Sequence, residues 1–187
     1  AGSGLTTIKR DFQYHGAVTH MTGLGFAGFQ GFSATNWYAT SSQRIFNVVQ
    51  NDIHKRGAPL LEYSTNTYAN LSSAPSGYIS KTSFTYSTPT IAANKVYKIY
   101  KTASATEDQL NGFTVNQSFS YDSYLNPTVI TTNYSTGETE RKEFTYANST
   151  SSNYYIGRPT KQVLKTTIDG NLFTTEESYT YNSYGFI

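Results

Sequence analysis

Cysteine is absent from this 187-residue chain, which excludes a disulfide framework and a thiolate metal site. Charge is scarce as well, because charged residues make up 14% of the chain against roughly 25% in an average globular domain. The 14 basic and 12 acidic residues nearly balance, so the chain lacks the clustered basic footprint that nucleic acid requires. No apolar run approaches the roughly 18 residues that cross a bilayer, and we expect no membrane span.

Aromatic residues, by contrast, are abundant and indicate the fold class. The 17 Tyr and 11 Phe supply most of an aromatic fraction of 16%. Tyr, Phe and Thr favour pleated, half-buried surfaces, whereas disordered chains have few aromatics and a high net charge. We therefore expect an all-β protein.

Four short segments share an aromatic-x-Tyr core, and each core predicts a strand that runs towards a turn. The cores end at Tyr86, Tyr121, Tyr146 and Tyr181. Further strands are expected at residues 128–134, 138–146, 161–167 and 172–181, with turns at residues 135–137 and 168–171. This pattern predicts an antiparallel β-hairpin meander.

The first sixty residues are instead rich in glycine and aromatics. Alternation predicts strands at residues 7–14 and 17–22 around a turn at His15-Gly16. A glycine bend is expected at residues 23–28, where backbones approach closely, followed by a strand at residues 33–40. Residues 44–50 are predicted to form a strand and the following residues, up to Lys55, one helical turn.

Three stretches rich in Ser, Thr, Asn or Ala predict loops. They lie at residues 66–77, 103–109 and 148–153.

Two groups of short motifs resemble those of Rhs/YD-repeat shell proteins, the family of insecticidal toxin complex B components and related plasmid virulence toxins. In the first group, an aromatic-x-aromatic hairpin leads into the glycine-rich stretch, where Leu24 stands in place of the family's Arg. In the second group, a Tyr-Asp pair, a Gly-Arg-Pro segment and a Tyr-Asn motif follow the family's order, although Leu125 stands where a Gly is usual. The motif residues are Gly23, Gly25, Gly28, Phe29, Gly57, Pro59, Tyr121, Asp122, Tyr146, Gly157, Pro159, Tyr181, Asn182 and Gly185.

This resemblance implies both a fold and a function. Members of the family build a long β-sheet that spirals into a hollow shell, and in bacteria the shell sequesters a C-terminal toxin. The chain is then expected to be a structural segment of a larger secreted or cell-surface protein, whose partners are the rest of the parent polypeptide and the enclosed toxin domain. On this interpretation residues 1–4 are a cloning remnant, residues 5–62 a glycine- and aromatic-rich β segment, and residues 63–187 YD-like hairpin repeats truncated at the C-terminus.

Two sequence patterns resemble a dinucleotide-binding site and a metal site. Residues 23–28 read Gly-x-Gly-x-x-Gly, but a dinucleotide site needs a following helix, and the residues after this motif favour a strand. Asp11, His15 and His20 lie on adjacent predicted strands, yet they lack the fourth ligand and outer partners that define a metal site.

A group of three carboxylates is a further candidate, for the active site of a glycosidase. Glu138, Glu140 and Glu143 sit beside Arg141 and Lys142, a pattern that favours exposed charge pairs over the two opposed carboxylates of a glycosidase. We therefore expect no enzymatic activity, no metal and no cofactor.

A second class of function stays open, namely a surface adhesin or carbohydrate-binding β-module. Aromatic faces stack on sugar rings, which makes Trp37 and Tyr38 a candidate platform, while ordinary cross-strand pairing is the competing explanation. The unpaired edge of a truncated sheet also predicts weak self-association through the last strand, at residues 172–187.

Overall fold

Strands make up most of the computed structural model, which describes residues 7–20, 25–67, 73–88, 90–91, 97–151, 154–182 and 185. Two single-turn 3-10 helices, η1 (Ser41–Gln43) and η2 (Ile53–Lys55), interrupt the strands. The strands are β1 (Phe12–His20), β2 (Gly25–Thr35), β3 (Phe46–Asp52), β4 (Ala58–Thr65), β5 (Tyr78–Tyr86), β6 (Thr90–Ile91), β7 (Tyr97–Lys98), β8 (Lys101–Asp108), β9 (Phe113–Tyr121), β10 (Pro127–Tyr134), β11 (Thr139–Ser149), β12 (Tyr155–Ile168) and β13 (Asn171–Ser178).

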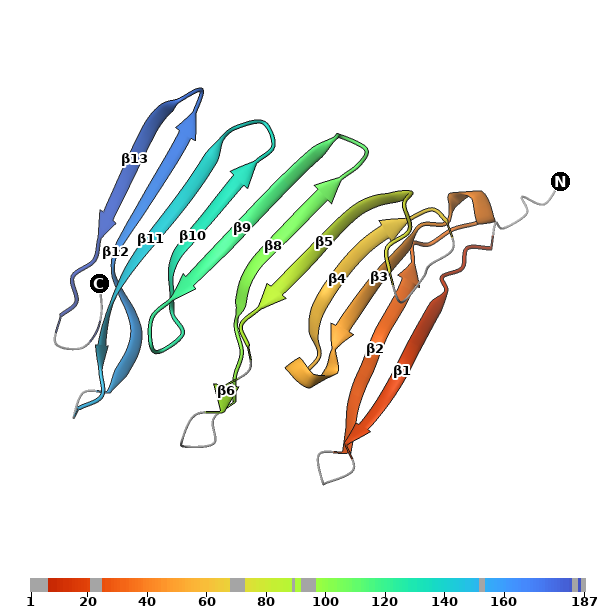
Figure 1. Cartoon of the computed structure of the whole chain (residues 1–187), viewed down its shortest axis with the longest axis horizontal. Coiled ribbons are helices and arrows are strands. Elements are labelled where there is room, and N and C mark those ends of the chain that lie inside the picture. The colour runs from red at the N-terminus through yellow and green to blue at the C-terminus, as the bar shows by residue number, and fades with distance from the viewer. Residues whose placement is uncertain are drawn as a thin grey trace. The chain divides into compact units, whose positions relative to one another are not determined.

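Successive strands pair in an antiparallel meander, as the alternating sequence predicts. The order β1-β2-β3-β4-β5-β8-β9-β10-β11-β12-β13 follows the chain, and β6 and β7 pair separately. Figure 1 shows β1 to β5, and likewise β9 to β13, lying side by side in chain order. The chain divides into two units, residues 1–99 with 106–113, and residues 100–105 with 114–187, which are described separately below.

The N-terminal unit has a small core on one face of its strands. Phe46 and Val48 alternate along β3 and therefore point to the same face, where Tyr63 of β4 pairs with Val48. Leu61, Ala74 and Tyr78 pack against these three residues. On β2 the same face buries Ser33 and Thr35, the pairing partners of Val48 and Phe46.

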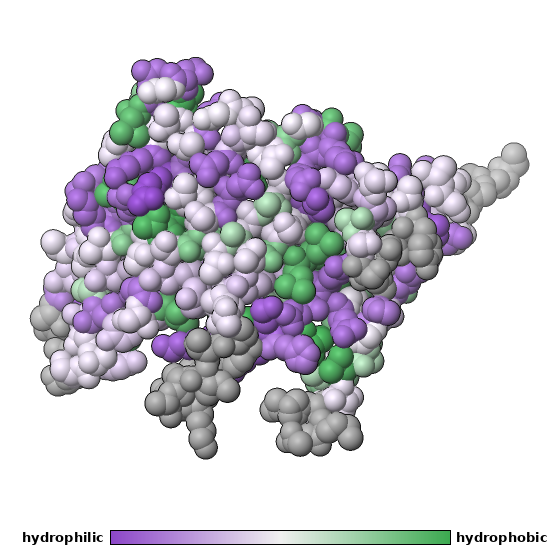
Figure 2. Space-filling view, viewed as in Figure 1, coloured by the Kyte–Doolittle hydropathy of each residue, from purple (hydrophilic) through white to green (hydrophobic). Residues whose placement is uncertain are grey.

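In strands β9 to β11 of the C-terminal unit, the exposed side chains lie on one face. Ile130 of β10 lies between Phe119 of β9 and Lys142 of β11, and Lys142 pairs in turn with Leu164. The opposite face carries the exposed residues Asn116, Ser118, Ser120, Asn133, Arg141 and Thr145. Figure 2 shows that hydrophobic residues form small patches interrupted by hydrophilic ones on the visible face.

Several predicted elements agree with the structure. The turn at residues 135–137 has Gly137 at φ 104°, and the turn between β12 and β13 has Asp169 at φ 50° and Gly170 at φ 76°. Positive φ at both central residues is the geometry that an Asp-Gly hairpin favours. The helical turn predicted to end at Lys55 is η2.

The predicted turn at His15-Gly16 is wrong. Strand β1 continues through it, because His15 pairs with Gly31 and Ala17 with Phe29. Gly16 has φ 62°, and a Cβ there would lie 2.3 Å from the side-chain oxygen of Gln30. This glycine therefore permits a close approach of strands instead of reversing the chain.

The glycine bend predicted at residues 23–28 is likewise wrong for residues 25–28, which belong to β2. Between Val18 and Thr19 the pairing partner changes from Gly28 to Phe26, so Ala27 is an extra residue in a β-bulge. The strand predicted at residues 33–40 ends at Thr35, and Tyr38 forms an isolated bridge with Lys9.

The loop predicted at residues 103–109 is also wrong, because residues 103–108 belong to β8. Small polar side chains make cross-strand hydrogen bonds there: Thr106 with Thr82 in the N-terminal unit, and Ser104 with Gln117 in the C-terminal unit. Composition suggested a loop, but pairing with neighbouring strands decides the conformation.

Candidate functional site

One side-chain contact recurs in three described strand pairs, β8–β9, β10–β11 and β12–β13. The hydroxyl of Tyr121 donates a 2.8 Å hydrogen bond to the backbone carbonyl of Lys101, at the far end of the partner strand. Tyr146 donates in the same way to Pro127 at 2.9 Å. Tyr181, just beyond β13, donates to Pro159 at 2.6 Å.

These three tyrosines are the last residues of three of the four aromatic-x-Tyr cores that the sequence contains, the fourth core being the one that ends at Tyr86. Each bond ties the open end of a hairpin, opposite its tight turn, to the preceding strand. Burial raises the pKa of Tyr121 and Tyr146, so the hydroxyls stay protonated and able to donate. We call this contact the tyrosine latch.

Asp122, next to the first latch, organises the turn from β9 to β10. Its Oδ1 accepts hydrogen bonds from the backbone N–H groups of Tyr124 and Asn126, both at 2.9 Å. Its Oδ2 accepts from the side-chain amides of Asn126 at 2.8 Å and Asn148 at 3.3 Å. Leu125 completes the turn at φ 67°, donating its N–H to the carbonyl of Asp122 at 3.1 Å.

Burial works against ionisation of Asp122, but the hydrogen bonds from Asn126, Tyr124 and Asn148 outweigh it and lower its pKa. Four donors already occupy the two carboxylate oxygens. The group is therefore a structural acceptor, and it has neither the raised pKa of a general acid nor free oxygens for a metal ion.

Asn148 extends this turn to the next pair of strands. While its amide NH₂ group binds Asp122, its Oδ1 accepts a 2.7 Å hydrogen bond from the N–H of Gly157. Gly157 has φ 75°, and a Cβ there would lie 2.7 Å from Oδ1 of Asn126. The Gly157 position thus requires glycine for two reasons, its φ and its packing.

The Tyr-Asn motif at the end of β13 repeats the turn geometry of the Tyr-Asp motif. Gly185 donates its N–H to the carbonyl of Asn182 at 3.0 Å, as Leu125 does to Asp122, and has φ 85°. The Arg158 guanidinium lies 4.0 Å from the ring centroid of Tyr155 and 4.9 Å from that of Tyr181. The backbone carbonyl of Pro159 accepts the hydrogen bond from the Tyr181 hydroxyl.

The remaining motif residues occupy backbone positions of the N-terminal unit. Gly25, at φ 68°, begins β2, and Gly28, at φ 112°, lies in the β-bulge. Gly57 has φ 74° after η2, and Pro59 of β4 pairs with Asn51 at a register irregularity. Gly23 lies outside the described residues.

Phe29 belongs to an aromatic cluster on the same two strands. Its ring lies 4.8 Å from that of Tyr14 and 5.2 Å from that of Phe26, measured between centroids. These contacts pack the bulged end of β2 against β1.

The predicted sugar platform does not form as a pair. Trp37 is 63% exposed, but Tyr38 is only 4% exposed. The Tyr38 hydroxyl donates a 2.5 Å hydrogen bond to Asp11, and the Arg44 guanidinium lies 5.7 Å from its ring centroid. Tyr38 is therefore a packing residue without a free face.

The predicted carboxylate cluster forms ion pairs along and across strands. Glu140 pairs with Lys142 at 3.0 Å, and Glu143 bridges Arg141 at 2.6 Å and Lys165 at 2.9 Å. The Arg141 bond, followed by the Lys165 bond, lowers the pKa of Glu143. These contacts agree with the charge-pair interpretation.

A metal site on β1 has no support from Asp11, which is bound by Tyr38 and Arg44. Across the described ranges, no three His, Cys, Asp or Glu side chains are placed to hold a metal ion. The same residues contain no helix long and apolar enough to span a membrane.

Sequence reasoning missed the amides that complete the Asp122 turn. Asn126 is part of the Tyr-Asp motif, but the contact of Asn148 is not foreseen, because nothing in the sequence pairs Asn148 with a turn that lies 26 residues before it. The sole signal was the positive-φ requirement after Asp122, where Leu125 occupies a glycine-like position.

The fold is that of a segment of known toxin complex chains. No protein-family model and no curated protein matches the sequence. The crystal structure of TcdB2-TccC3 without its hypervariable C-terminal region matches with a TM-score of 0.61 at 9% identity. That of TcdB2-TccC3 matches with a TM-score of 0.60 at 8% identity, and the complex TcdB2-TccC3-Cdc42 with 0.61 at 8%.

These matches cover most of this chain but little of the other chains. The match to TcdB2-TccC3 without its hypervariable C-terminal region covers 89% of this chain and 12% of that chain, and the match to TcdB2-TccC3-Cdc42 covers the same shares. The match to TcdB2-TccC3 covers 96% of this chain and 13% of that chain. The likeness therefore shows that the all-β meander is a fold shared with a small part of much larger chains.

Proposed function

We propose that this chain is a non-catalytic structural segment of a large Rhs/YD-repeat protein, in which it builds part of a β-shell. The shell encloses or presents a toxin or effector domain. The partners of the segment are the rest of its own polypeptide and that domain, and the parent protein acts outside the cell or at its surface.

The observation that carries this proposal is the tyrosine latch. The same hydrogen bond, from a tyrosine hydroxyl to a backbone carbonyl, occurs in successive hairpins. Its three copies are Tyr121–Lys101, Tyr146–Pro127 and Tyr181–Pro159. In a repeat array each unit contacts only its neighbours, so contacts between adjacent hairpins stabilise the array. Such an array can gain further repeats without a change to one central core.

The scarcity of buried side chains supports the same proposal. In the described part of the chain, the buried apolar residues are Ala34, Tyr38, Phe46, Val48, Tyr63 and Val163. So small a set of buried apolar side chains is atypical of a domain built around an apolar internal cleft.

The Asp122 turn supports a non-catalytic role. Its carboxylate has a lowered pKa and four donors, and the carboxylates of β11 are ion-paired. Catalytic acids and bases instead have pKa values shifted towards the working pH.

The proposal is tested by cryo-electron microscopy of the complete natural polypeptide that contains this chain. We expect β1 and β13 to pair with strands contributed by flanking sequence, and the continued sheet to surround a cavity that holds another domain. A structure in which this unit stands apart, with both edge strands solvated and no enclosed domain, would overturn the proposal.

A further inference from the structure

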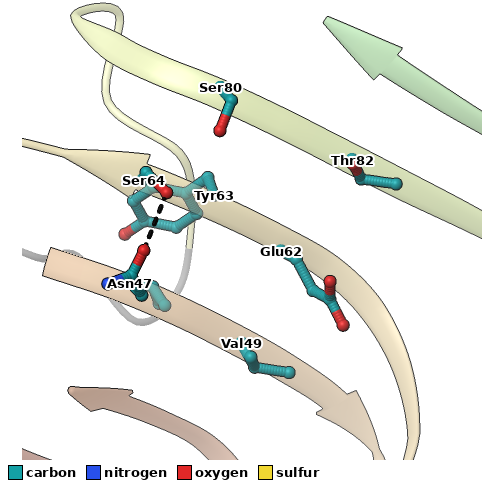
Figure 3. A pocket seen from close by; sticks show the side chains of 8 residues that line it. Asn47, Val49, Glu62, Tyr63, Ser64, Ser80 and Thr82 are labelled. Carbon is teal, nitrogen blue, oxygen red and sulfur yellow. Dashed lines mark hydrogen bonds between the residues drawn. The ribbon is translucent and has the colours of Figure 1, made fainter. Parts of the chain in front are cut away.

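A polar hollow of about 190 Å³ lies on the N-terminal unit, over strands β3, β4 and β5. Six of its lining residues share one face, Asn47, Val49, Glu62, Ser64, Ser80 and Thr82, and the core residues Val48 and Tyr63 complete the lining (Figure 3). The core residues Phe46 and Val48 alternate with Asn47 and Val49 along β3, so the hollow opens on the face opposite the core.

The strand register connects this hollow to exposed aromatic rings. Residues directly opposite each other across strands share a face. One row runs Tyr14, Phe32, Val49, Glu62 and Thr82 across five strands.

A parallel row joins Phe12 and Ala34 to Asn47, Ser64 and Ser80. Phe12 is 56% exposed, which places a second open ring on the same face. In the first row, Tyr14 is 61% and Phe32 37% exposed. The polar residues of the hollow therefore share one face with the partly exposed rings of Phe32 on β2 and of Tyr14 and Phe12 on β1.

Glu62 differs from the other carboxylates of the molecule. Within the described ranges, only Glu62 and Asp169 have a carboxylate with no hydrogen-bond or ion-pair partner, and Asp169 lies at the tip of a turn. The other described carboxylates are bound by lysine, arginine, tyrosine, asparagine or threonine side chains.

Asn47, which lines the same hollow as Glu62, is oriented by a hydrogen bond from Ser64. The Ser64 hydroxyl donates a 2.9 Å hydrogen bond to Oδ1 of Asn47, which orients the amide (Figure 3). The Asn47 NH₂ group keeps two donors for another molecule. Glu62, with acceptor oxygens only, complements these donors.

We propose that this hollow binds a neutral oligosaccharide, with one sugar ring against Phe32 and its hydroxyl groups on Glu62 and Asn47. A sugar presents an apolar ring face and a polar hydroxyl edge, and the two rows offer one surface for each. A single carboxylate among hydroxyls and an amide suits hydroxyl donors, whereas a Ca²⁺ ion takes six to eight oxygen ligands. The proposal does not depend on the shell function.

The test is a titration of the isotope-labelled chain with maltohexaose, cellohexaose and N-acetylchitohexaose, followed by amide NMR. We expect at least one sugar to shift the amides of Val49, Glu62 and Ser80 in a saturable way. Glu62→Gln and Phe32→Ala should each weaken that sugar about tenfold, as expected for losing a charge-assisted hydrogen bond or a stacking ring.

Trp37→Ala is the matched control, because it removes an exposed aromatic ring elsewhere in the same unit. It should leave binding unchanged, and the fluorescence of Trp37, the single tryptophan, should not respond to sugar. Shifts confined to Trp37, or no shift with any of the three sugars at millimolar concentration, would overturn the proposal. Binding of spermidine that needs Glu62 without any sugar binding would also overturn it, in favour of a cationic ligand.

Discussion

The hydroxyl of Tyr146 donates a 2.9 Å hydrogen bond to the backbone carbonyl of Pro127, across the open end of the β10–β11 hairpin. Tyr121 and Tyr181 repeat this contact on their own hairpins. The tyrosine of the aromatic-x-Tyr motif thus links two neighbouring strands by a hydrogen bond. The contribution of this bond to the free energy of unfolding can be measured.

Removal of one latch hydroxyl should destabilise the chain. In Tyr146→Phe the ring stays and the carbonyl of Pro127 loses its donor, so we expect the free energy of unfolding to fall by about 1 kcal/mol. Urea denaturation followed by circular dichroism measures this loss. Tyr154→Phe, at a tyrosine that is 73% exposed, is the control and should change stability little. Equal effects of the two variants would show that the latch adds nothing to stability.

The Asp122 turn should make stability depend on pH. The folded-state pKa of Asp122 lies below its ordinary value of 3.8, so its stabilisation is fully present above that value. It is lost as the pH falls through the lower, folded-state pKa. Denaturation midpoints of the parent chain should therefore fall as the pH drops below about 4, towards the folded-state pKa of Asp122.

The variant Asp122→Asn isolates this contribution from that of the other carboxylates. It should be less stable at neutral pH by about 1–2 kcal/mol, because one oxygen that accepts from Asn126 becomes a donor. Its midpoint should also change less with acidification than that of the parent chain. An identical pH slope in both proteins would mean that the Asp122 turn does not titrate with folding.

Leu125 occupies a left-handed backbone position, at φ 67°, that glycine adopts without strain. We expect Leu125→Gly to leave the free energy of unfolding unchanged or to raise it by up to about 1 kcal/mol, since relief of strain offsets lost packing. Leu172→Gly is the matched control on the exposed strand β13, and it should lower stability by about 0.5–1 kcal/mol. Equal losses in the two variants would show that Leu125 is not strained.

Gly157 and Gly170 offer a paired test of close packing, because their φ angles are 75° and 76°. An alanine at either position meets the same backbone strain, of about 1 kcal/mol. At Gly157 alone, the Cβ would also lie 2.7 Å from Asn126, whereas nothing lies within 4 Å at Gly170. Thermal denaturation should therefore show Gly157→Ala to be the less stable by a further 1–3 kcal/mol, about the cost of overpacking.

The edge strand β13 should support weak self-association. All eight of its residues are exposed, including Leu172 at 64% and Phe173 at 58%. Glu176 opposes pairing of two copies, but Lys161 binds it at 2.8 Å, and salt screens the rest. Sedimentation velocity should show association that rises with concentration and salt.

Lysine at both apolar edge positions, Leu172→Lys with Phe173→Lys, should abolish that association, since charged side chains protect sheet edges. Asn133→Lys on the interior strand β10 is the control. A strictly monomeric parent chain at high concentration and salt, with protected amides along β13, would mean that the edge is already covered.

The sequence by itself determined the strand content and the hairpin repeats of the C-terminal unit. Alternation and an Asp-Gly turn are local signals, and the structure places β10, β11, β12 and β13 where they predict. The Tyr121-Asp122 motif marked the turn from β9 to β10 that the structure shows.

Tertiary pairing alone decided the rest. Gly16 has a turn-forming φ yet lies inside β1, because both of its neighbours bond to β2. Residues 103–108 form a strand for the same reason, although their composition suits a loop. Tyr38 and Trp37 are adjacent in sequence, but one is buried and the other exposed, since only Tyr38 reaches Asp11. Local propensities are worth a fraction of a kcal/mol per residue, and such distant partners outweigh them.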